Sequence, residues 1–203
     1  MHLLDAYQIL KKLEPTFSTK EAVETLRVSK NNASLILSRL EKKHTIVRLS
    51  RGHWAYSNSI DPLLLPAALT YPMMAYISLY SALYFHGMIE QIPSTIFAIT
   101  NGKTKLFKTP LATISIHSIN SYLFTGYKSM GDHSILLATP EKCLFDTLYL
   151  IPAKSNKFKR LTEIELPEKF NFKLFNTWLK LVKNESRKSS IINHLKLLNI
   201  NLL

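Results

Sequence analysis

Residues 29–56 read SKNNASLILSRLEKKHTIVRLSRGHWAY, and this stretch decides how the first part of the chain folds. A serine suited to a helix N-cap is followed by apolar residues that recur every three or four positions, which predicts a helix over 30–43. β-Branched residues then predict a strand over 44–49, and a turn containing Gly52 leads into a return strand over 53–57. We therefore expect a helix followed by a β-hairpin.

The residues before this stretch supply two more helices. Helical spacing of apolar residues over 3–13 predicts a first helix, which Pro15 ends. Ser18 and Glu21 form a capping box that starts a short second helix. Three helices with a tight second turn, followed by a hairpin, are the order of a winged helix-turn-helix, which we expect over 1–60.

One face of the third predicted helix is polar and basic. Its apolar stripe includes Ala33 and Leu37, and the opposite face carries no acid. Asparagine and arginine can pair with adenine and guanine, serine and lysine suit phosphates, and a wing arginine can bind phosphate or the minor groove. Two alternatives stay open: a solvated helix face, and a winged helix used for protein contacts. The DNA-binding candidates are Lys30, Asn31, Asn32, Ser34, Ser38, Arg39, Lys42, Arg48, Arg51 and His53.

The net charge of +12 is concentrated at the two ends of the chain. Residues 1–60 carry +5, residues 61–153 are neutral and residues 154–203 carry +7. A basic balance favours polyanion partners, nucleic acid above all, although a lysine-rich codon bias would also produce it. Prolines interrupt the one long uncharged stretch, over 62–89, so we expect no membrane span. The single Cys143 excludes an internal disulfide.

The rest of the chain predicts a mixed α+β domain over 61–203. A proline-spaced linker is expected to end near Tyr76, and a helix is expected from about Tyr76 or Ser78 to His86. Asn101-Gly102 is typical of a hairpin turn, and Thr139-Pro140 is typical of a helix start. The expected strands are 95–100, 105–108, 112–117, 122–127 and 134–138. The fold class is thus α+β: an N-terminal winged helix-turn-helix, then a mixed α+β domain with a C-terminal helical segment.

The last part of the chain, 154–203, is expected to be a basic helical tail. Its basic run over 154–160 contains one aromatic residue and is either a second nucleic-acid contact or a solvated loop. Apolar stripes predict helices over 173–184 and 187–199. We expect the apolar stripes to pack into the core and the lysine-rich outer sides to face solvent. A partner-binding surface on these helices is the alternative.

Catalytic patterns are missing from the sequence. It contains no glycine-rich phosphate loop, and its seven histidines are dispersed, so we expect no cofactor, no metal and no catalytic residue. Asp132, Glu141 and Asp146 could be imagined as a metal-dependent nuclease site. Glu141 and Asp146 are five positions apart on one predicted helix and do not share a face, so we expect no enzyme.

Three segments, taken in order, resemble the AbiEi family of antitoxins and transcriptional regulators. They are LSRGHWA at 49–55, ISLYSALYFHG at 77–87 with Ile92-Pro93 after it, and ATPEKCLFDTL at 138–148. Together they span most of residues 1–151, and their order is more specific than any one of them. The chain after Ile151 carries no matching motif.

The resemblance implies a cytoplasmic, nucleoid-associated repressor that binds inverted repeats upstream of its own operon, with two copies binding cooperatively. It also implies a type IV toxin–antitoxin system for phage defence. The toxin there resembles nucleotidyltransferases, and the antitoxin opposes it without a stable complex. By position, Arg39, Lys42, Arg48 and Arg51 match the family's basic DNA-facing residues. A stand-alone regulator, or an RNA- or protein-interaction module of the same architecture, stays open as the alternative.

Overall fold

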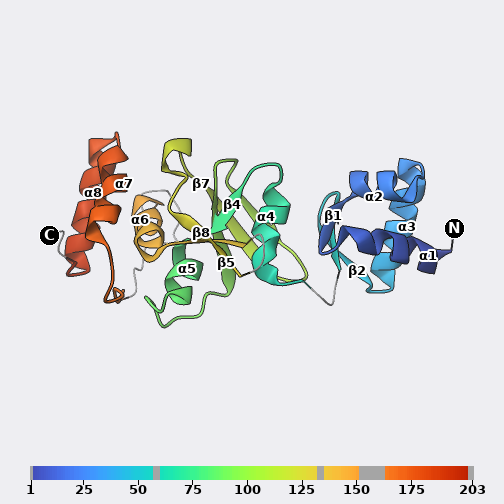
Figure 1. Ribbon diagram of the computed structural model, residues 1–203, viewed down its shortest axis with the longest axis horizontal. Helices are drawn as coiled ribbons and strands as arrows, with labels where there is room; N and C mark the ends of the chain where they lie inside the picture. The colour runs from blue at the N-terminus through green and yellow to red at the C-terminus, as the bar shows by residue number, and fades with distance from the viewer. Residues whose placement is uncertain (1, 57–59, 132–134, 151–162, 201–203) are drawn as a thin grey trace.

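The computed structural model describes residues 2–56, 60–131, 135–150 and 163–200. The chain is a mixed α+β protein, as the sequence predicts, and its described residues form a three-stranded and a six-stranded sheet. Figure 1 shows the N-terminal helices and small sheet at one end of the molecule and the last two helices at the other. The six-stranded sheet lies between them.

Three helices and three short strands make up the N-terminal end. The expected first helix divides into α1 and a 3-10 turn, η1, before Pro15. The elements are α1 (Leu3–Leu10), η1 (Lys11–Leu13), β1 (Thr16–Ser18), α2 (Thr19–Leu26), α3 (Lys30–Lys42), β2 (Ile46–Ser50) and β3 (His53–Tyr56).

Side-chain caps fix where α2 and α3 begin. The Glu21 amide donates to Ser18 Oγ at 3.1 Å, and the Ser18 amide donates to Glu21 Oε2 at 2.6 Å, which confirms the capping box. The Asn32 amide donates to Ser29 Oγ at 3.3 Å at the start of α3. Arg27, at φ 52°, closes α2 in the left-handed region and makes the tight turn between the two helices.

The small sheet, in the order β1-β3-β2, contributes buried residues from both of its faces. Trp54 and Tyr56 point into a core formed with α1, α2 and α3. Leu49 and Ala55 point the other way and belong to the large core of the rest of the chain. Because side chains alternate along a strand, one hairpin joins the two cores.

The six-stranded sheet has the order β6-β7-β5-β4-β9-β8. β5 pairs in parallel with β7 and β4 with β9, and the other neighbours are antiparallel. Three of the five neighbouring pairs join consecutive strands of the chain, whereas β5–β7 passes over β6 and β4–β9 joins strands far apart in sequence. The strands are β4 (Ala75–Ile77), β5 (Thr95–Thr100), β6 (Lys105–Lys108), β7 (Thr113–Ser118), β8 (Tyr127–Met130) and β9 (Ile135–Ala138).

Helix α6 (Pro140–Leu150) occupies the centre of the large core. Every residue from Glu141 to Leu150 is buried, because α5 (Leu79–Phe85), β9, α7 (Phe172–Leu181) and α8 (Glu185–Leu197) all contact it. Figure 1 shows α6 between the sheet and the final helix pair. The expected helix start at Thr139-Pro140 and the two C-terminal helices are confirmed.

Two expectations for the region before α5 are wrong. The segment expected to be a linker contains a 3-10 turn, η2 (Pro62–Leu64), and the helix α4 (Leu65–Thr70). Tyr76 lies in β4, so the earlier of the two expected helix starts is wrong; Ser78 is the N-cap, and the helix runs from Leu79. All three residues of β4 are buried between β5 and β9, so pairing on both sides outweighs the helical spacing of the side chains.

Two strand expectations are also wrong. Asn101-Gly102 does not join β5 to an antiparallel partner, because β5 lies between β4 and β7 and the next strand, β6, pairs with β7. The segment 122–127 contains a 3-10 turn, η3 (Ser121–Leu123), and β8 starts only at Tyr127. The basic run over 154–160 lies outside the described residues. Within the described ranges, no helix is long and apolar enough to cross a membrane.

Candidate nucleic-acid interface

Helix α3 presents most of the candidate residues on one exposed face. Ala33, Leu37 and Leu40 are buried on its other side. The large apolar side chain of Leu35 is 57% exposed on the same helix. Lys30, Asn31, Asn32, Ser34, Arg39 and Lys42 are all exposed, whereas Ser38 is half-buried.

The charge on this face is positive. Glu41 is the only acid of α3; it is half-buried, and helical spacing places it at the edge of this face, beside Ser34 and Ser38. Ser34 Oγ donates to the Lys30 carbonyl at 2.9 Å, so its hydroxyl retains acceptor capacity only. The helix therefore offers cationic groups, amides and one apolar side chain to a partner.

The hairpin adds two arginines to the same end of the molecule. Arg48 lies opposite Trp54 in the β2–β3 register, and its guanidinium is 5.5 Å from the centre of the Trp54 ring. This cation–π contact holds Arg48 on the face of the sheet that meets the helices. Arg51 is exposed at the tip of the hairpin, where Gly52 has the φ of 81° that the turn requires.

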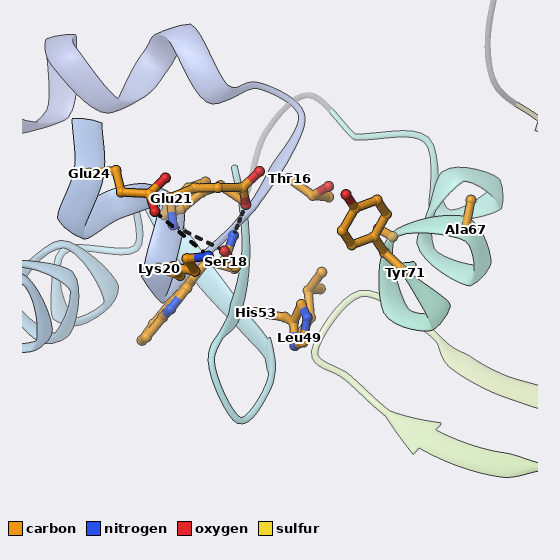
Figure 2. Close-up of a pocket in the computed structure, with 12 residues that line it drawn as sticks. Thr16, Ser18, Lys20, Glu21, Glu24, Leu49, His53, Ala67 and Tyr71 are labelled. Atoms are coloured by element: carbon orange, nitrogen blue, oxygen red, sulfur yellow. Dashed lines mark hydrogen bonds and ion pairs between the residues drawn. The ribbon is translucent and has the colours of Figure 1, made fainter. Parts of the chain in front are cut away.

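His53 is separated from the other candidates. It belongs to the face of β3 that carries Ala55, and the hydrogen bond between its Nδ1 and Ser50 Oγ measures 3.1 Å. Figure 2 shows it in the cleft between the small sheet and α4, on the side of Tyr71. The structure thus sets the α3 candidates on one helix, Arg48 and Arg51 on the hairpin that follows it, and His53 on the inner side of that hairpin.

A buried polar cluster in the large core was not found by sequence reasoning. Lys142 and Asp146 form an ion pair on α6, and both side chains are completely buried. Tyr76 and Ser78 donate hydrogen bonds to Asp146 Oδ2 at 3.0 and 2.8 Å. The signal available in the sequence was the pair of opposite charges four positions apart in a mostly apolar helix.

Burial dominates the electrostatics of this cluster. It raises the pKa of the Asp146 carboxyl and lowers the pKa of the Lys142 ammonium, while the charge of each partner opposes the shift of the other. Burial and then the Asp146 charge raise the pKa of the Tyr76 hydroxyl. The aromatic rings of Tyr76, Phe145 and Trp178 surround the ammonium group at 5.1 to 5.6 Å.

These acids do not form a metal site in the described part of the chain. Asp146 is bound by Lys142 and the two hydroxyls, and the Glu141 carboxylate accepts from the Asn171 amide at 3.0 Å. Asp132 lies outside the described residues. No group of three potential metal ligands comes together among the described residues. A scan against models of protein families and a search among curated proteins each found no match to this chain.

Proposed function

We propose that this protein is a sequence-specific DNA-binding transcriptional repressor whose residues 1–60 form a winged helix-turn-helix. The observation that carries the proposal is the exposed, predominantly basic face of α3, with Arg48 and Arg51 on the adjoining hairpin. An α-helix fits the major groove of B-DNA, and a neighbouring hairpin can reach the flanking backbone. The order α1, α2, α3, β2, β3 agrees with this use.

The side chains divide into two roles. Asn31, Leu35 and Arg39 have the chemistry for reading base edges, since amides pair with adenine, guanidinium with guanine and an apolar group with the thymine methyl. Lys42 and Arg51 have the chemistry for phosphate binding. His53 is left out of the proposed contact set because its ring lies on the inner face of the hairpin.

The biological role proposed here rests on the AbiEi resemblance. The protein would bind inverted repeats upstream of its own operon as two copies, because a palindromic site presents the same half-site twice. Residues 61–203 would act as the antitoxin domain against a nucleotidyltransferase-like toxin, without a stable complex. The site of action would be the nucleoid in the cytoplasm.

The test is fluorescence anisotropy of the full-length protein on its own upstream DNA and on a shuffled duplex, over a salt series. A preference for its own DNA of about 10³-fold or more is expected. The variant Arg39→Ala/Arg51→Ala should lose this preference while its circular dichroism spectrum is unchanged. The matched control is Lys173→Ala/Lys180→Ala, which removes two exposed charges from α7 at the opposite end of the molecule.

Equal, weak binding to both duplexes would overturn the repressor proposal and favour the RNA- or protein-interaction module. The antitoxin role has its own test. Growth rescue from the neighbouring toxin should survive in Arg39→Ala/Arg51→Ala, because the variant leaves the second domain intact. Loss of rescue together with loss of DNA binding would show that the two roles are not separable as proposed.

A further inference from the structure

The tip of the β2–β3 hairpin, Arg51-Gly52, is bound to the start of α2. The Thr19 amide donates a hydrogen bond to the Gly52 carbonyl at 2.8 Å. Thr19 is the first residue of α2, so its amide has no partner within the helix itself. The two residues are 33 positions apart in sequence. This bond therefore fixes the hairpin tip against the helix that precedes α3.

The Thr19 side chain adds two further hydrogen bonds at the same place. Its Oγ1 accepts from Trp54 Nε1 at 2.9 Å and donates, more weakly, to the Gly52 carbonyl at 3.5 Å. The hydroxyl is thus used both as an acceptor and as a donor. We call the hydrogen bonds of Thr19 to Gly52 and Trp54 the tip contact.

Trp54 gives the tip contact a rigid support. Its side chain is 5% exposed in the N-terminal core, and it pairs with Phe17 of β1 and with Arg48 of β2 on the middle strand of the small sheet. The face of the same indole ring lies 5.5 Å from the Arg48 guanidinium. One side chain therefore contacts one hairpin arginine directly and supports, through Thr19, the residue that follows the other.

Order at the hairpin tip matters for a cation that must meet a partner. Arg51 is exposed and immediately precedes Gly52. Ordering a loop and a long side chain on binding costs free energy, and a loop whose backbone is already fixed avoids its share of that cost. The tip contact leaves mainly the Arg51 side chain to be ordered.

We propose that Thr19 and Trp54 are positioning residues for DNA binding, which hold the hairpin tip so that Arg51 is presented to the phosphate backbone. Neither residue is assigned a contact with DNA. Both act through the tip, Thr19 by its hydrogen bonds and Trp54 by fixing the Thr19 hydroxyl. The inference rests on the proposed function, because it concerns the hairpin of the same interface.

The first test is the fluorescence anisotropy of full-length variants on the protein's own upstream DNA. Thr19→Val removes the hydroxyl and keeps the shape of the side chain. It should weaken binding at least about threefold, within the range that one hydrogen bond contributes. Thr19→Ser retains the hydroxyl and should bind as the wild type does. Ala6→Gly is the control for general destabilisation, because Ala6 is buried in the same core on α1, and it should leave the affinity unchanged.

A double-variant cycle shows whether Thr19 acts through Arg51. Thr19→Val should weaken DNA binding further by less than about twofold in the Arg51→Ala background, because the tip then carries no cation to position. Equal losses from Thr19→Val with and without Arg51 would overturn the positioning role. An equal loss in Ala6→Gly would overturn it too, since it would show an effect of lower stability.

Trypsin cleavage of the free protein tests the tip contact without DNA. Arg51 at the tip and Arg27 in the turn after α2 are both exposed. The rate of cleavage after Arg51 relative to Arg27 follows local opening of the tip, and it should rise at least about threefold in Thr19→Val. Thr19→Ser and Ala6→Gly should leave this ratio unchanged.

The two measurements separate the ways of failing. An unchanged cleavage ratio in Thr19→Val would overturn the tip contact itself. A raised ratio with unchanged affinity, in a protein that prefers its own DNA, would overturn the positioning role. A raised ratio in a protein without that preference would overturn the repressor proposal, and with it the positioning role, while the tip contact would stand.

Discussion

Lys142 and Asp146 lie one turn apart on α6 and form an ion pair from which solvent is completely excluded. The carboxylate also accepts hydrogen bonds from Tyr76 and Ser78, so the pair ties the central helix to the start of α5 and to β4. A buried charge is tolerated only when partners replace the water it has lost, and here four groups satisfy one another.

Removing one partner of this ion pair should therefore destabilise the fold strongly. Lys142→Met leaves the Asp146 carboxylate buried without a counter-charge, and we expect a loss of about 3–5 kcal/mol in the free energy of unfolding, measured in urea. Lys142→Met/Asp146→Asn removes both charges and keeps an acceptor for the two hydroxyls. It should recover at least about 1 kcal/mol. A double variant no more stable than the single one would show that charge is not the cause.

Gly126 is expected to be intolerant of any side chain. Its φ is 80°, and an added Cβ would overlap the Trp178 ring and approach Lys142 Cδ. Gly126→Ala should cost about 3 kcal/mol or more, because backbone strain is joined by a clash in the core. Gly131→Ala is the control: its φ is 67°, but the added Cβ would meet no atom of the described residues within 4 Å. It should cost only about 1 kcal/mol, and equal losses in thermal unfolding would contradict the packing argument.

Tyr56 carries a buried hydroxyl that has no hydrogen-bond partner in the described residues. Tyr56→Phe should raise the free energy of unfolding at neutral pH by about 1 kcal/mol, since an unsatisfied buried group is removed and the ring stays. Its contacts with Tyr7 and Phe17, at 5.8 and 5.6 Å between ring centres, are preserved. A destabilised variant would mean that the hydroxyl has a partner after all.

The same variant should change the alkaline limb of the stability curve. Burial, followed by the negative charge of Glu14, raises the pKa of Tyr56 above its ordinary value of 10. The unfolded chain then loses this proton at lower pH than the folded one. Wild-type stability should fall as the pH rises above 10, and the fall should be shallower in Tyr56→Phe. Denaturation titrations between pH 8 and about 11 check this, and parallel curves would contradict it.

The parts of the fold that sequence reasoning predicted correctly are those that local chemistry determines. Ser18 with Glu21, and Ser29, cap their helices through bonds spanning three residues, so the pattern is visible in the sequence itself. The apolar stripes of α3, α7 and α8 likewise require only one-sided burial. The placement of the α3 candidates on one exposed face followed from the same periodicity.

The errors arose where pairing with strands distant in sequence determines the local structure. Asn101-Gly102 has the local signature of a hairpin, but here Gly102 permits a close approach, since an added Cβ would lie 3.2 Å from Met73 Cγ. Tyr76 has helical spacing to the residues after it, yet its segment pairs with β5 and β9 and forms a strand. The position of His53 follows from strand alternation, which puts it on the face of Ala55 and opposite Trp54, and from the place of α4 beyond that face, which sequence reasoning did not predict.

Leu49 should be the residue that couples the two cores. It is 4% exposed and packs with the large core from a strand of the small sheet. Leu49→Ala is expected to lower the free energy of unfolding by about 2–4 kcal/mol and to split one unfolding transition into two. The matched control is Leu4→Ala, because Leu4 is 70% exposed and should change nothing measurable. A single, unshifted transition in Leu49→Ala would show that the cores are joined elsewhere.

The two roles assigned on α3 should separate in their dependence on salt. Lys42→Gln removes a proposed phosphate contact, so the slope of log affinity against log salt should fall by about one unit while the preference over shuffled DNA is unchanged. Arg39→Ala removes a proposed base contact and should reduce that preference about tenfold or more. Lys180→Gln on the distant α7 should alter neither quantity. The opposite result would be that Lys42→Gln reduces the preference for the protein's own DNA and Arg39→Ala changes only the salt slope. It would mean that Lys42 faces the bases and Arg39 faces the phosphates.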